Sequence, residues 1–179
     1  MGAYYMCALK QKDDETYTIY ENKYSLKLLE HSYIYDSYLL EVKKILFEKK
    51  FNVIWLCDYC EDEEINWNKL SKVNFYIKKV HGSKLRYLYN HTKKVYIDYF
   101  YLEGLYRKYQ NDNWFIDPLP ILTNSEIDYA GGGDYSLDDA RRGSWKGDLL
   151  EVVYDHVETY EDVTHKMMFF ENKIIDIDF

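Results

Sequence analysis

The run Phe51-Asn52-Val53-Ile54-Trp55-Leu56-Cys57 (residues 51–57) is the stretch that decides the fold, because its apolar character is almost unbroken. A short apolar run bounded by polar residues predicts a buried strand at the centre of a sheet. The run ends at Asp58, and the acidic residues 61–64 follow shortly after. The sequence therefore predicts that the chain emerges from the core at Asp58.

Two helices are expected on either side of this strand. Residues 35–49 carry apolar side chains at helical spacing with Lys and Glu between them, which predicts a long amphipathic helix. Asp36 or Ser37 is expected to cap its start. A second, shorter helix is expected over residues 64–79, whereas residues 101–110 fit a strand or a short helix equally well.

The remaining segments with strong local preferences predict strands. They are rich in β-branched, aromatic or alternating apolar residues, and polar turns separate them. These segments are residues 3–10, 16–20, 25–30, 85–89, 95–100, 149–157, 166–170 and 174–179. With no linker or internal repeat, residues 1–179 are expected to form a single α+β domain: a mostly antiparallel sheet with one long amphipathic helix and one shorter helix.

Composition limits the classes of partner. The chain has 179 residues and a net charge of −8, which argues against a nonspecific nucleic-acid binder and suits either solubility or a basic partner. Its 21 tyrosines suit protein recognition, because Tyr offers a large contact area with a polar tip; a genome of biased base composition explains the same excess.

The sequence also favours a location in the cytoplasm. No apolar run reaches the length of a membrane-spanning helix, and the first residues do not form a secretion signal. Three cysteines do not make a disulfide framework. The single pair Cys57 and Cys60 lacks the second pair that a structural zinc site needs, so no metal ligands are assigned.

Residues 116–148 form the most irregular stretch, with both prolines and five of the eight glycines. Gly131, Gly132 and Gly133 run into Asp134 and Tyr135, and such a run can form a backbone nest for an anion. It matches neither the dinucleotide fingerprint nor the P-loop.

The end of this stretch adds cations. Arg141 and Arg142 are expected to bind phosphate or carboxylate, unless Asp138 and Asp139 of the same stretch pair with them. Trp145 is expected to anchor the stretch on the core.

Five residues are candidates for catalysis. His31 and His91 lie at turns beside polar neighbours and have the side chain best suited to proton transfer near neutral pH, although a structural hydrogen bond is the alternative role. Asp58 follows the central strand, a common place for working residues. Asp58, Asp134 and Asp148 would make a carboxylate cluster for a divalent metal if the fold brings them together.

Several segments together resemble small proteins encoded on prophages and other mobile elements of Gram-positive bacteria. The resemblance spans most of the chain and rests on Met1-Gly2-Ala3-Tyr4, Leu29-Glu30-His31-Ser32-Tyr33, Trp55 with Asp58-Tyr59, Asn90-His91-Thr92-Lys93-Lys94, Pro118-Leu119-Pro120 with Leu122-Thr123, Gly131–Tyr135, and Gly143-Ser144-Trp145 with Asp148. It implies an antagonist of host defence, similar to the anti-CRISPR proteins of type II systems.

The sequence therefore leaves two candidate functions. In the first, an acidic, Tyr-rich surface binds a Cas9-type effector or its guide RNA complex, whose nucleic-acid channel is basic. In the second, the protein is a metal-dependent nuclease or another phosphate-directed hydrolase, with guide RNA as a candidate substrate. The second requires His31, Asp58, Asp134 and Asp148 to converge in one cleft.

Overall fold

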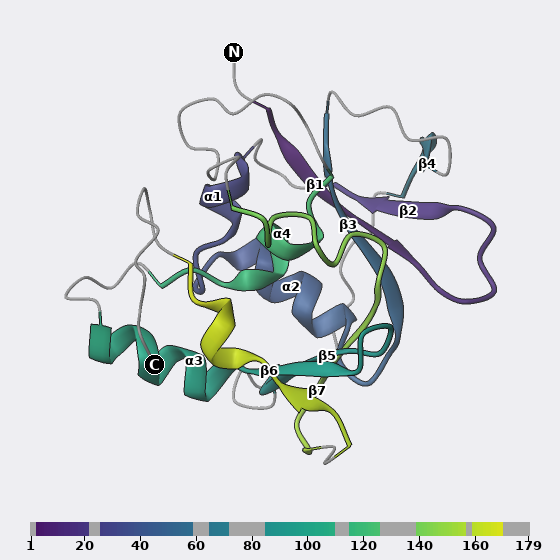
Figure 1. The fold of residues 1–179 in the computed structure, drawn as a ribbon. Coiled ribbons are helices and arrows are strands. Elements are labelled where there is room, and N and C mark those ends of the chain that lie inside the picture. The colour runs from purple at the N-terminus through teal and green to yellow at the C-terminus, as the bar shows by residue number, and fades with distance from the viewer. Residues whose placement is uncertain are drawn as a thin grey trace.

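The computed structural model describes residues 3–21, 26–58, 65–71, 85–109, 115–125, 139–156 and 159–169 (Figure 1). These ranges contain one eight-stranded sheet with the strand order β4-β2-β1-β3-β7-β5-β6-β8. Its strands are β1 (Tyr5–Lys10), β2 (Tyr17–Tyr20), β3 (Phe51–Cys57), β4 (Ile65–Ser71), β5 (Tyr87–Asn90), β6 (Val95–Asp98), β7 (Leu149–Val153) and β8 (Glu161–Asp162).

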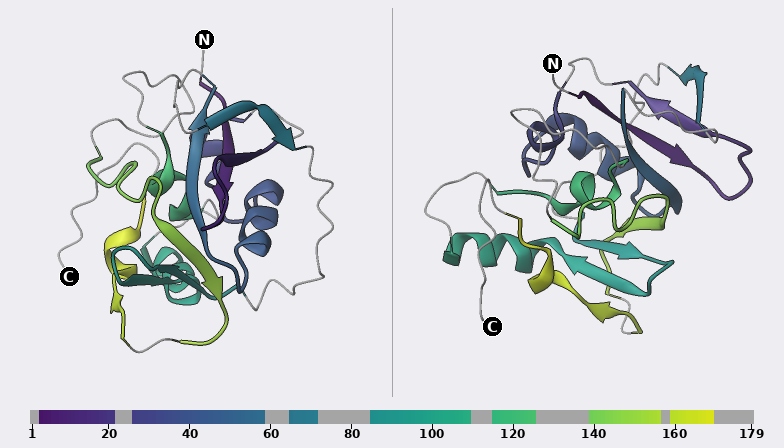
Figure 2. Two further views of the ribbon diagram at one scale, coloured as in Figure 1. Left: turned by 90° about the vertical axis from the view of Figure 1, so that its right-hand side faces the viewer. Right: turned by 45° about the horizontal axis from the view of Figure 1, so that its top comes forward.

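The apolar run that decides the fold is β3, and it lies at the centre of the sheet as predicted. β1 pairs antiparallel with almost the whole of β3, from Tyr5 opposite Cys57 to Lys10 opposite Asn52. β7 pairs only with the first residues of β3, where Asn52 lies opposite Leu149. β3 therefore links the two halves of the sheet, β1, β2 and β4 on one side and β5 to β8 on the other (Figure 2).

The interior pairings of the sheet are antiparallel, and parallel pairs occur only at its two edges, between β2 and β4 and between β6 and β8. An antiparallel pair needs only a short connection. Residues 91–94 join β5 to β6 in this way, and Lys94 takes a positive φ of 60° in the turn. The expected α+β class with a mostly antiparallel sheet is confirmed.

The helices differ from expectation. They are α1 (Leu28–His31), α2 (Ser37–Ile45), α3 (Tyr99–Tyr109) and α4 (Pro118–Thr123), with a 3-10 turn at Thr164–Met167. The single long helix expected over residues 35–49 is wrong, because α2 has nine residues and α3 has eleven. Asp36 caps α2 as predicted, accepting from the Leu39 N–H at 2.7 Å. The helix stops early because the Glu48 N–H bonds to the Val152 carbonyl, which draws the chain towards β7.

Three further segments were predicted wrongly. Residues 65–71 form β4 where a helix was expected, and residues 72–79 lie outside the described ranges. Residues 28–31 form α1 where a strand was expected, since the Glu30 carboxylate accepts from the Lys27 N–H at 2.8 Å and caps the turn. Residues 164–167 form a 3-10 turn and not a strand, and the expected strand at 174–179 lies outside the described ranges.

Local capping settles two segments that the sequence left open. Asp98 accepts from the Phe100 and Tyr101 N–H groups at 2.9 and 3.2 Å, so residues 99–109 begin as a helix. Asp117 accepts from the Leu119 N–H at 3.0 Å, and Pro118 suits the first helical position, so α4 forms inside the irregular stretch.

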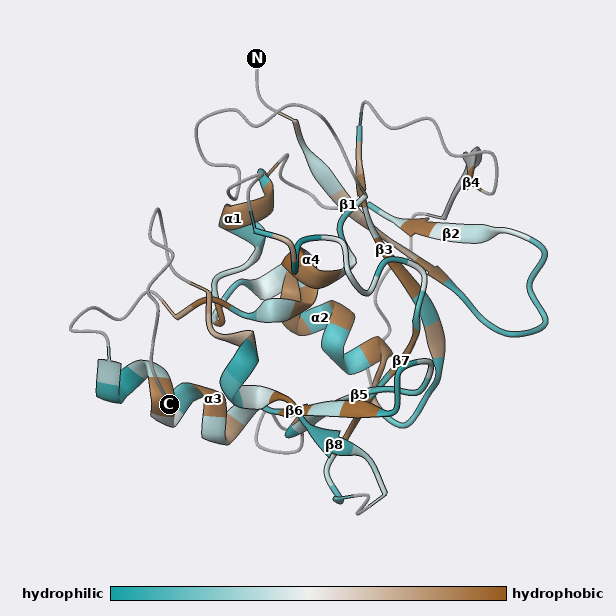
Figure 3. Ribbon diagram, in the orientation of Figure 1, coloured by the Kyte–Doolittle hydropathy of each residue, from teal (hydrophilic) through white to brown (hydrophobic). Residues whose placement is uncertain are grey.

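A hydrophobic core joins the helices to one face of the sheet, with hydrophobic residues along β3 and α4 (Figure 3). It encloses one buried ion pair, in which the Lys43 Nζ of α2 lies 2.8 Å from an oxygen of Asp117. The same Nζ lies 3.4 Å from the ring centroid of Tyr99. The pair therefore fixes α2 against α3 and the start of α4.

No helix within the described ranges is both long enough and apolar enough to cross a membrane.

Candidate functional site

His91 is the centre of a hydrogen-bonded chain at the turn that follows β5. Its Nε2 lies 2.8 Å from an oxygen of Glu151 in β7, and its Nδ1 lies 2.9 Å from the hydroxyl of Tyr160. The Nζ of Lys94 lies 3.2 Å from the same hydroxyl. The side chains of His91 and Glu151 are 14% and 16% exposed, so the group is accessible from solvent. We call Lys94, Tyr160, His91 and Glu151 the His91 relay.

The chemistry of these groups gives the chain of hydrogen bonds a direction. An ionised carboxylate only accepts, so a neutral His91 carries its proton on Nε2 and donates to Glu151. Nδ1 is then an acceptor, and Tyr160 donates its hydroxyl proton to it. Lys94 donates to the Tyr160 oxygen. Every donor therefore points towards Glu151, and His91 is placed to receive the Tyr160 proton.

The surroundings keep His91 neutral. Burial lowers the pKa of His91 below its ordinary value; the hydrogen bond that His91 donates to Glu151 opposes this shift, and the charges of Lys50 and Lys94 reinforce it. A histidine with a lowered pKa is deprotonated at neutral pH and is available as a base.

The His91 relay stands on the face of the sheet opposite the helices. Tyr89 pairs with Glu151 and Leu88 with Val152, so residues of odd number in β5 and β7 share one face. On that face Tyr87, Tyr89 and Tyr96 form a cluster separate from the main core. Burial and the carboxylate of Asp162 raise the pKa of Tyr96 to about 12, so its hydroxyl stays protonated.

Rings of this cluster hold the relay in place. The Tyr89 ring lies 6.2 Å from His91 in a stacked arrangement and 5.3 Å from Tyr160 edge-on. Such contacts fix the rotamers of His91 and Tyr160 before any ligand arrives.

Asp148 lies close to this turn but outside the relay. Its carboxylate accepts from the Asn90 amide at 2.7 Å and lies 3.4 Å from the Lys93 Nζ. Asn90 in turn accepts from the Lys93 N–H at 2.9 Å. Asp148 therefore shapes the turn that carries His91.

Asp58 and His31 lie at the other end of β3. Asp58 bonds twice to Tyr4: its carboxylate accepts from the Tyr4 N–H at 3.0 Å, and its backbone N–H donates to the Tyr4 carbonyl at 2.9 Å. His31 is fully buried and donates from Nε2 to the Tyr5 carbonyl at 2.9 Å. Both side chains join β1 to its neighbours.

The expected carboxylate cluster does not form between Asp58 and Asp148. The backbone carbonyl of Asp148 accepts from the Val53 N–H near the start of β3, and five residue steps of extended chain lead from Val53 to Asp58, or roughly 17 Å. Asp134 lies outside the described ranges. In the part of the chain that the structure describes, no three His, Cys, Asp or Glu side chains are grouped so that they could hold a metal ion.

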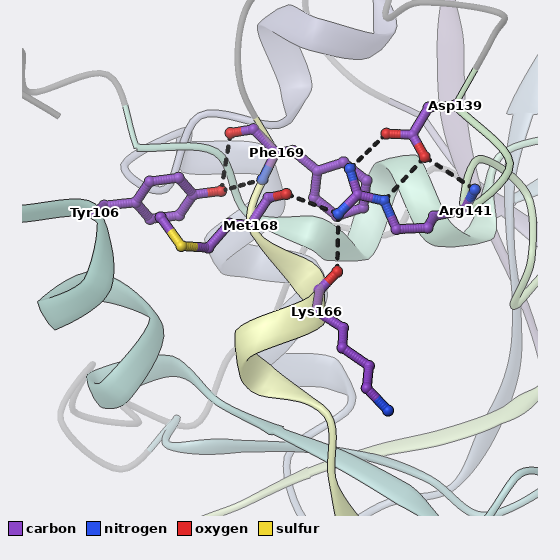
Figure 4. Close-up of polar contacts among 6 residues, drawn as sticks. All are labelled: Tyr106, Asp139, Arg141, Lys166, Met168 and Phe169. Atoms are coloured by element: carbon purple, nitrogen blue, oxygen red, sulfur yellow. Dashed lines mark hydrogen bonds and ion pairs between the residues drawn. The ribbon is translucent and has the colours of Figure 1, made fainter. Parts of the chain in front are cut away.

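Arg141 is engaged with protein groups (Figure 4). It makes a two-pronged bond to Asp139 at 2.9 and 2.6 Å, which is the internal pairing that the sequence offered as the alternative. It also donates to the carbonyls of Lys166 and Met168 at 2.8 Å each and lies 4.1 Å from the Phe169 ring centroid. Arg141 thus holds residues 166–169 in place.

Arg142 and Trp145 complete this part of the irregular stretch. Arg142 Nη2 donates to the Tyr5 hydroxyl at 3.3 Å, while its Nη1 is buried and has no hydrogen-bond partner among the described residues. Trp145 is buried, and its backbone N–H donates to the Leu122 carbonyl at 2.7 Å, which fits the expected anchor. Gly131, Gly132, Gly133 and Tyr135 lie outside the described ranges.

Sequence reasoning missed three members of the relay: Glu151, Tyr160 and Lys94. Glu151 meets His91 only through the register of β5 and β7, which joins residues sixty positions apart. The one signal available was an acidic residue inside the apolar run Leu149–Val153.

Comparison of the chain with models of protein families, with curated proteins and with solved structures finds no match.

Proposed function

We propose that this protein is an acid–base enzyme that hydrolyses phosphate esters, with Tyr160 as nucleophile and His91 as base. The observation that carries the proposal is the directed chain from Tyr160 through His91 to Glu151. A nucleophile bonded to a base, and a base oriented by a third group, is the arrangement that activates hydroxyl nucleophiles.

Two lysines favour an anionic substrate. Lys94 donates to the Tyr160 oxygen and stabilises the phenolate that forms when the proton leaves. Lys50 and Lys94 are exposed, and both lie close enough to His91 to influence its proton affinity. Lys94 beside the nucleophile and Lys50 near His91 attract a phosphate group and offset its charge in the transition state.

The reaction balances in two steps. The Tyr160 oxygen forms a bond to phosphorus as its proton moves to Nδ1 of His91; the bond from phosphorus to the ester oxygen breaks, and His91 gives the proton to the leaving alcohol. Water then attacks the phosphorus and passes a proton to His91. The bond between phosphorus and the Tyr160 oxygen breaks, and His91 returns the proton to that oxygen. Glu151 acts by positioning the His91 ring.

Hydrolysis of 4-nitrophenyl phosphate and bis(4-nitrophenyl) phosphate tests the proposal. Tyr160→Phe and His91→Asn are expected to lower kcat/KM by about 10²- to 10⁴-fold, as loss of an acid–base group does. Tyr154→Phe and His156→Gln are matched controls, because both side chains are exposed neighbours outside the relay. Absence of turnover in the folded wild type, or equal loss in the controls, would overturn the proposal.

A second candidate, antagonism of a Cas9-type effector, rests on a different surface. Among the described residues, six large hydrophobic side chains are exposed, and five of them lie on or near α3. Three belong to α3, one influences the pKa of Arg107 in α3, and one influences the pKa of Arg86, whose carbonyl accepts from the first N–H of α3. These five are Tyr35, Phe100, Tyr101, Tyr109 and Tyr154. Exposed aromatic residues are frequent anchors of protein interfaces.

Binding to an effector–guide RNA complex at low salt tests this candidate. A double variant, Tyr101→Ala with Tyr109→Ala, is expected to weaken binding at least tenfold, whereas Tyr160→Phe is expected to leave it unchanged. If the wild type does not bind such a complex, the candidate fails without affecting the enzyme proposal.

A further inference from the structure

The solvent side of α3 carries two aromatic residues, a glycine and two cations, in that order along the chain. α3 lies along one side of the fold (Figure 1). Phe100 and Tyr101 are 49% and 52% exposed. Gly104, Arg107 and Lys108 are exposed as well. We call these five residues the α3 face. The residues of α3 that pack into the core are Tyr99, Leu102, Leu105 and Tyr106.

Gly104 has no evident role within its own chain. It stands inside an α-helix, where glycine is less favourable than alanine. A Cβ added there would meet no heavy atom of the described residues within 4 Å, the nearby backbone of the helix aside. A glycine on an exposed helix face lets another backbone approach closely. Gly104 therefore marks the point at which a partner can come nearest to α3.

The α3 face is symmetric about Gly104 in its spacing. With 3.6 residues per turn, the positions three and four residues before and after Gly104 lie on the same side of the helix as Gly104. The aromatic residues occupy the two positions before it, and the cations occupy the two positions after it. A second α3 that crosses the first antiparallel at Gly104 would set each residue opposite the one equally far away in the other direction. Phe100 of one copy then faces Lys108 of the other, and Tyr101 faces Arg107.

These pairings suit the chemistry of the side chains, because a cation is attracted to the face of an aromatic ring. Both cations make such contacts within their own chain. Lys108 Nζ lies 4.7 Å from the ring centroid of Tyr109, and Arg107 Cζ lies 5.4 Å from that of Phe115. A parallel pair of helices would instead set cation against cation. The pattern therefore favours the antiparallel arrangement.

We propose that two copies of this chain associate through the α3 face, as an antiparallel, two-fold symmetric pair of helices that crosses at Gly104. A two-fold interface uses the same patch on both copies, so that patch must complement itself. The α3 face does so with two aromatic residues and two cations from each copy. The inference does not depend on the proposed enzyme activity. A second copy covers Tyr101, so it would compete with an effector that binds this surface.

Sedimentation equilibrium at several protein concentrations tests the inference. The wild type is expected to show an equilibrium between monomer and dimer. Phe100→Ala and Lys108→Ala should each raise the dissociation constant of the dimer at least tenfold. Tyr4→Ala removes an exposed aromatic side chain outside α3, so it is the matched control and should leave the dissociation constant unchanged.

An exchange of two residues tests the antiparallel pairing itself. Phe100→Lys sets lysine opposite lysine across the two-fold axis and should abolish the dimer. Adding Lys108→Phe to that variant restores an aromatic–cation pair at the same place and should bring the dimer back. A folded double variant that stays monomeric would overturn the inference.

Gly104→Gln keeps the test decisive if the exchanged variants do not fold. The new side chain enters open space in the monomer and favours the helix, so it should raise the Tm at concentrations where the wild type is monomeric. In the dimer it meets the partner at the crossing point, so the dissociation constant should rise at least tenfold. The inference is overturned if Gly104→Gln dimerises as the wild type does, or if the wild type is monomeric at every concentration. The latter result would leave the α3 face to a partner of another kind, and it would not affect the hydrolysis assay, which reports on Tyr160 and His91.

Discussion

At the scale of single residues, opposing influences set the pKa of His91. Burial, Lys50 and Lys94 lower its pKa, and Glu151 raises it. The net shift is downward, so the neutral ring is the resting form and Tyr160 has a base beside it.

Titration of His91 by NMR checks that balance. The midpoint is expected below the ordinary value of about 6.5. Glu151→Gln should lower it further, because a neutral partner no longer favours the imidazolium, and Lys50→Met should raise it. A wild-type midpoint above 6.5, or a rise in Glu151→Gln, would contradict the assignment.

The same shift predicts a pH dependence of stability. A lowered pKa in the folded state means that the unfolded chain binds this proton more readily between the folded pKa and about 6.5. The contribution of His91 to the free energy of unfolding is therefore full above about pH 6.5 and is lost as pH falls through that window. Urea unfolding of the wild type and His91→Asn at several pH values should show that the difference between them shrinks on acidification. A difference in stability between the two proteins that grows on acidification would contradict this prediction.

The buried pair Lys43 and Asp117 makes a second prediction at this scale. Asp117→Asn keeps the size of the side chain but leaves the Lys43 charge uncompensated in the core. Breaking a buried pair in this way costs about 3 to 5 kcal/mol. The double variant Lys43→Met with Asp117→Asn should regain most of that stability in urea unfolding. Additive losses would show that the two charges do not depend on each other.

At the scale of elements, residues 166–169 are held by two side chains from distant parts of the chain. Arg141 binds two of their carbonyls (Figure 4), and the Tyr106 hydroxyl of α3 accepts from the Phe169 N–H at 2.8 Å and lies within hydrogen-bond distance of its carbonyl at 3.1 Å. This segment follows β8, which pairs with β6. Tyr106 and Arg141 therefore stabilise the end of the sheet next to the relay.

Tyr106→Phe tests this role. It removes the hydroxyl that accepts from the Phe169 N–H and donates to the Ile116 carbonyl, which is expected to cost about 1 to 3 kcal/mol. Hydrogen exchange at the Phe169 amide should accelerate. Tyr101→Phe, on the exposed side of α3, serves as the control and should change neither quantity. Unchanged exchange in Tyr106→Phe would show that the segment is held elsewhere.

At the scale of the whole molecule, the sequence predicted the parts of the fold that local pattern controls. The apolar run of β3 and the hairpin of β5 and β6 were found, because burial and turn chemistry are encoded in neighbouring residues. Residues 28–31 and 65–71 were assigned the wrong element because short segments take their structure from capping and from edge pairing. The long stretch around Pro118 hid α4, whose cap is the single residue Asp117.

The candidate sites followed the same rule. His91 was named from its residue type and its place in a turn, but Glu151 and Tyr160 reach it through strand register, which no spacing in the sequence reveals. Arg141 and Arg142 are adjacent and of the same residue type, so the sequence does not show that Asp139 pairs with Arg141. The two ends of β3 separate the His91 relay from His31 and Asp58.

The central claim is that Tyr160 is the nucleophile that His91 activates. The most direct measurement is mass spectrometry of the protein quenched in acid during turnover of 4-nitrophenyl phosphate. A phosphoryl group is expected on Tyr160 in the wild type, at much lower occupancy in His91→Asn and at wild-type occupancy in Tyr154→Phe. Turnover with no adduct on Tyr160, or with the adduct on another residue, would contradict the account.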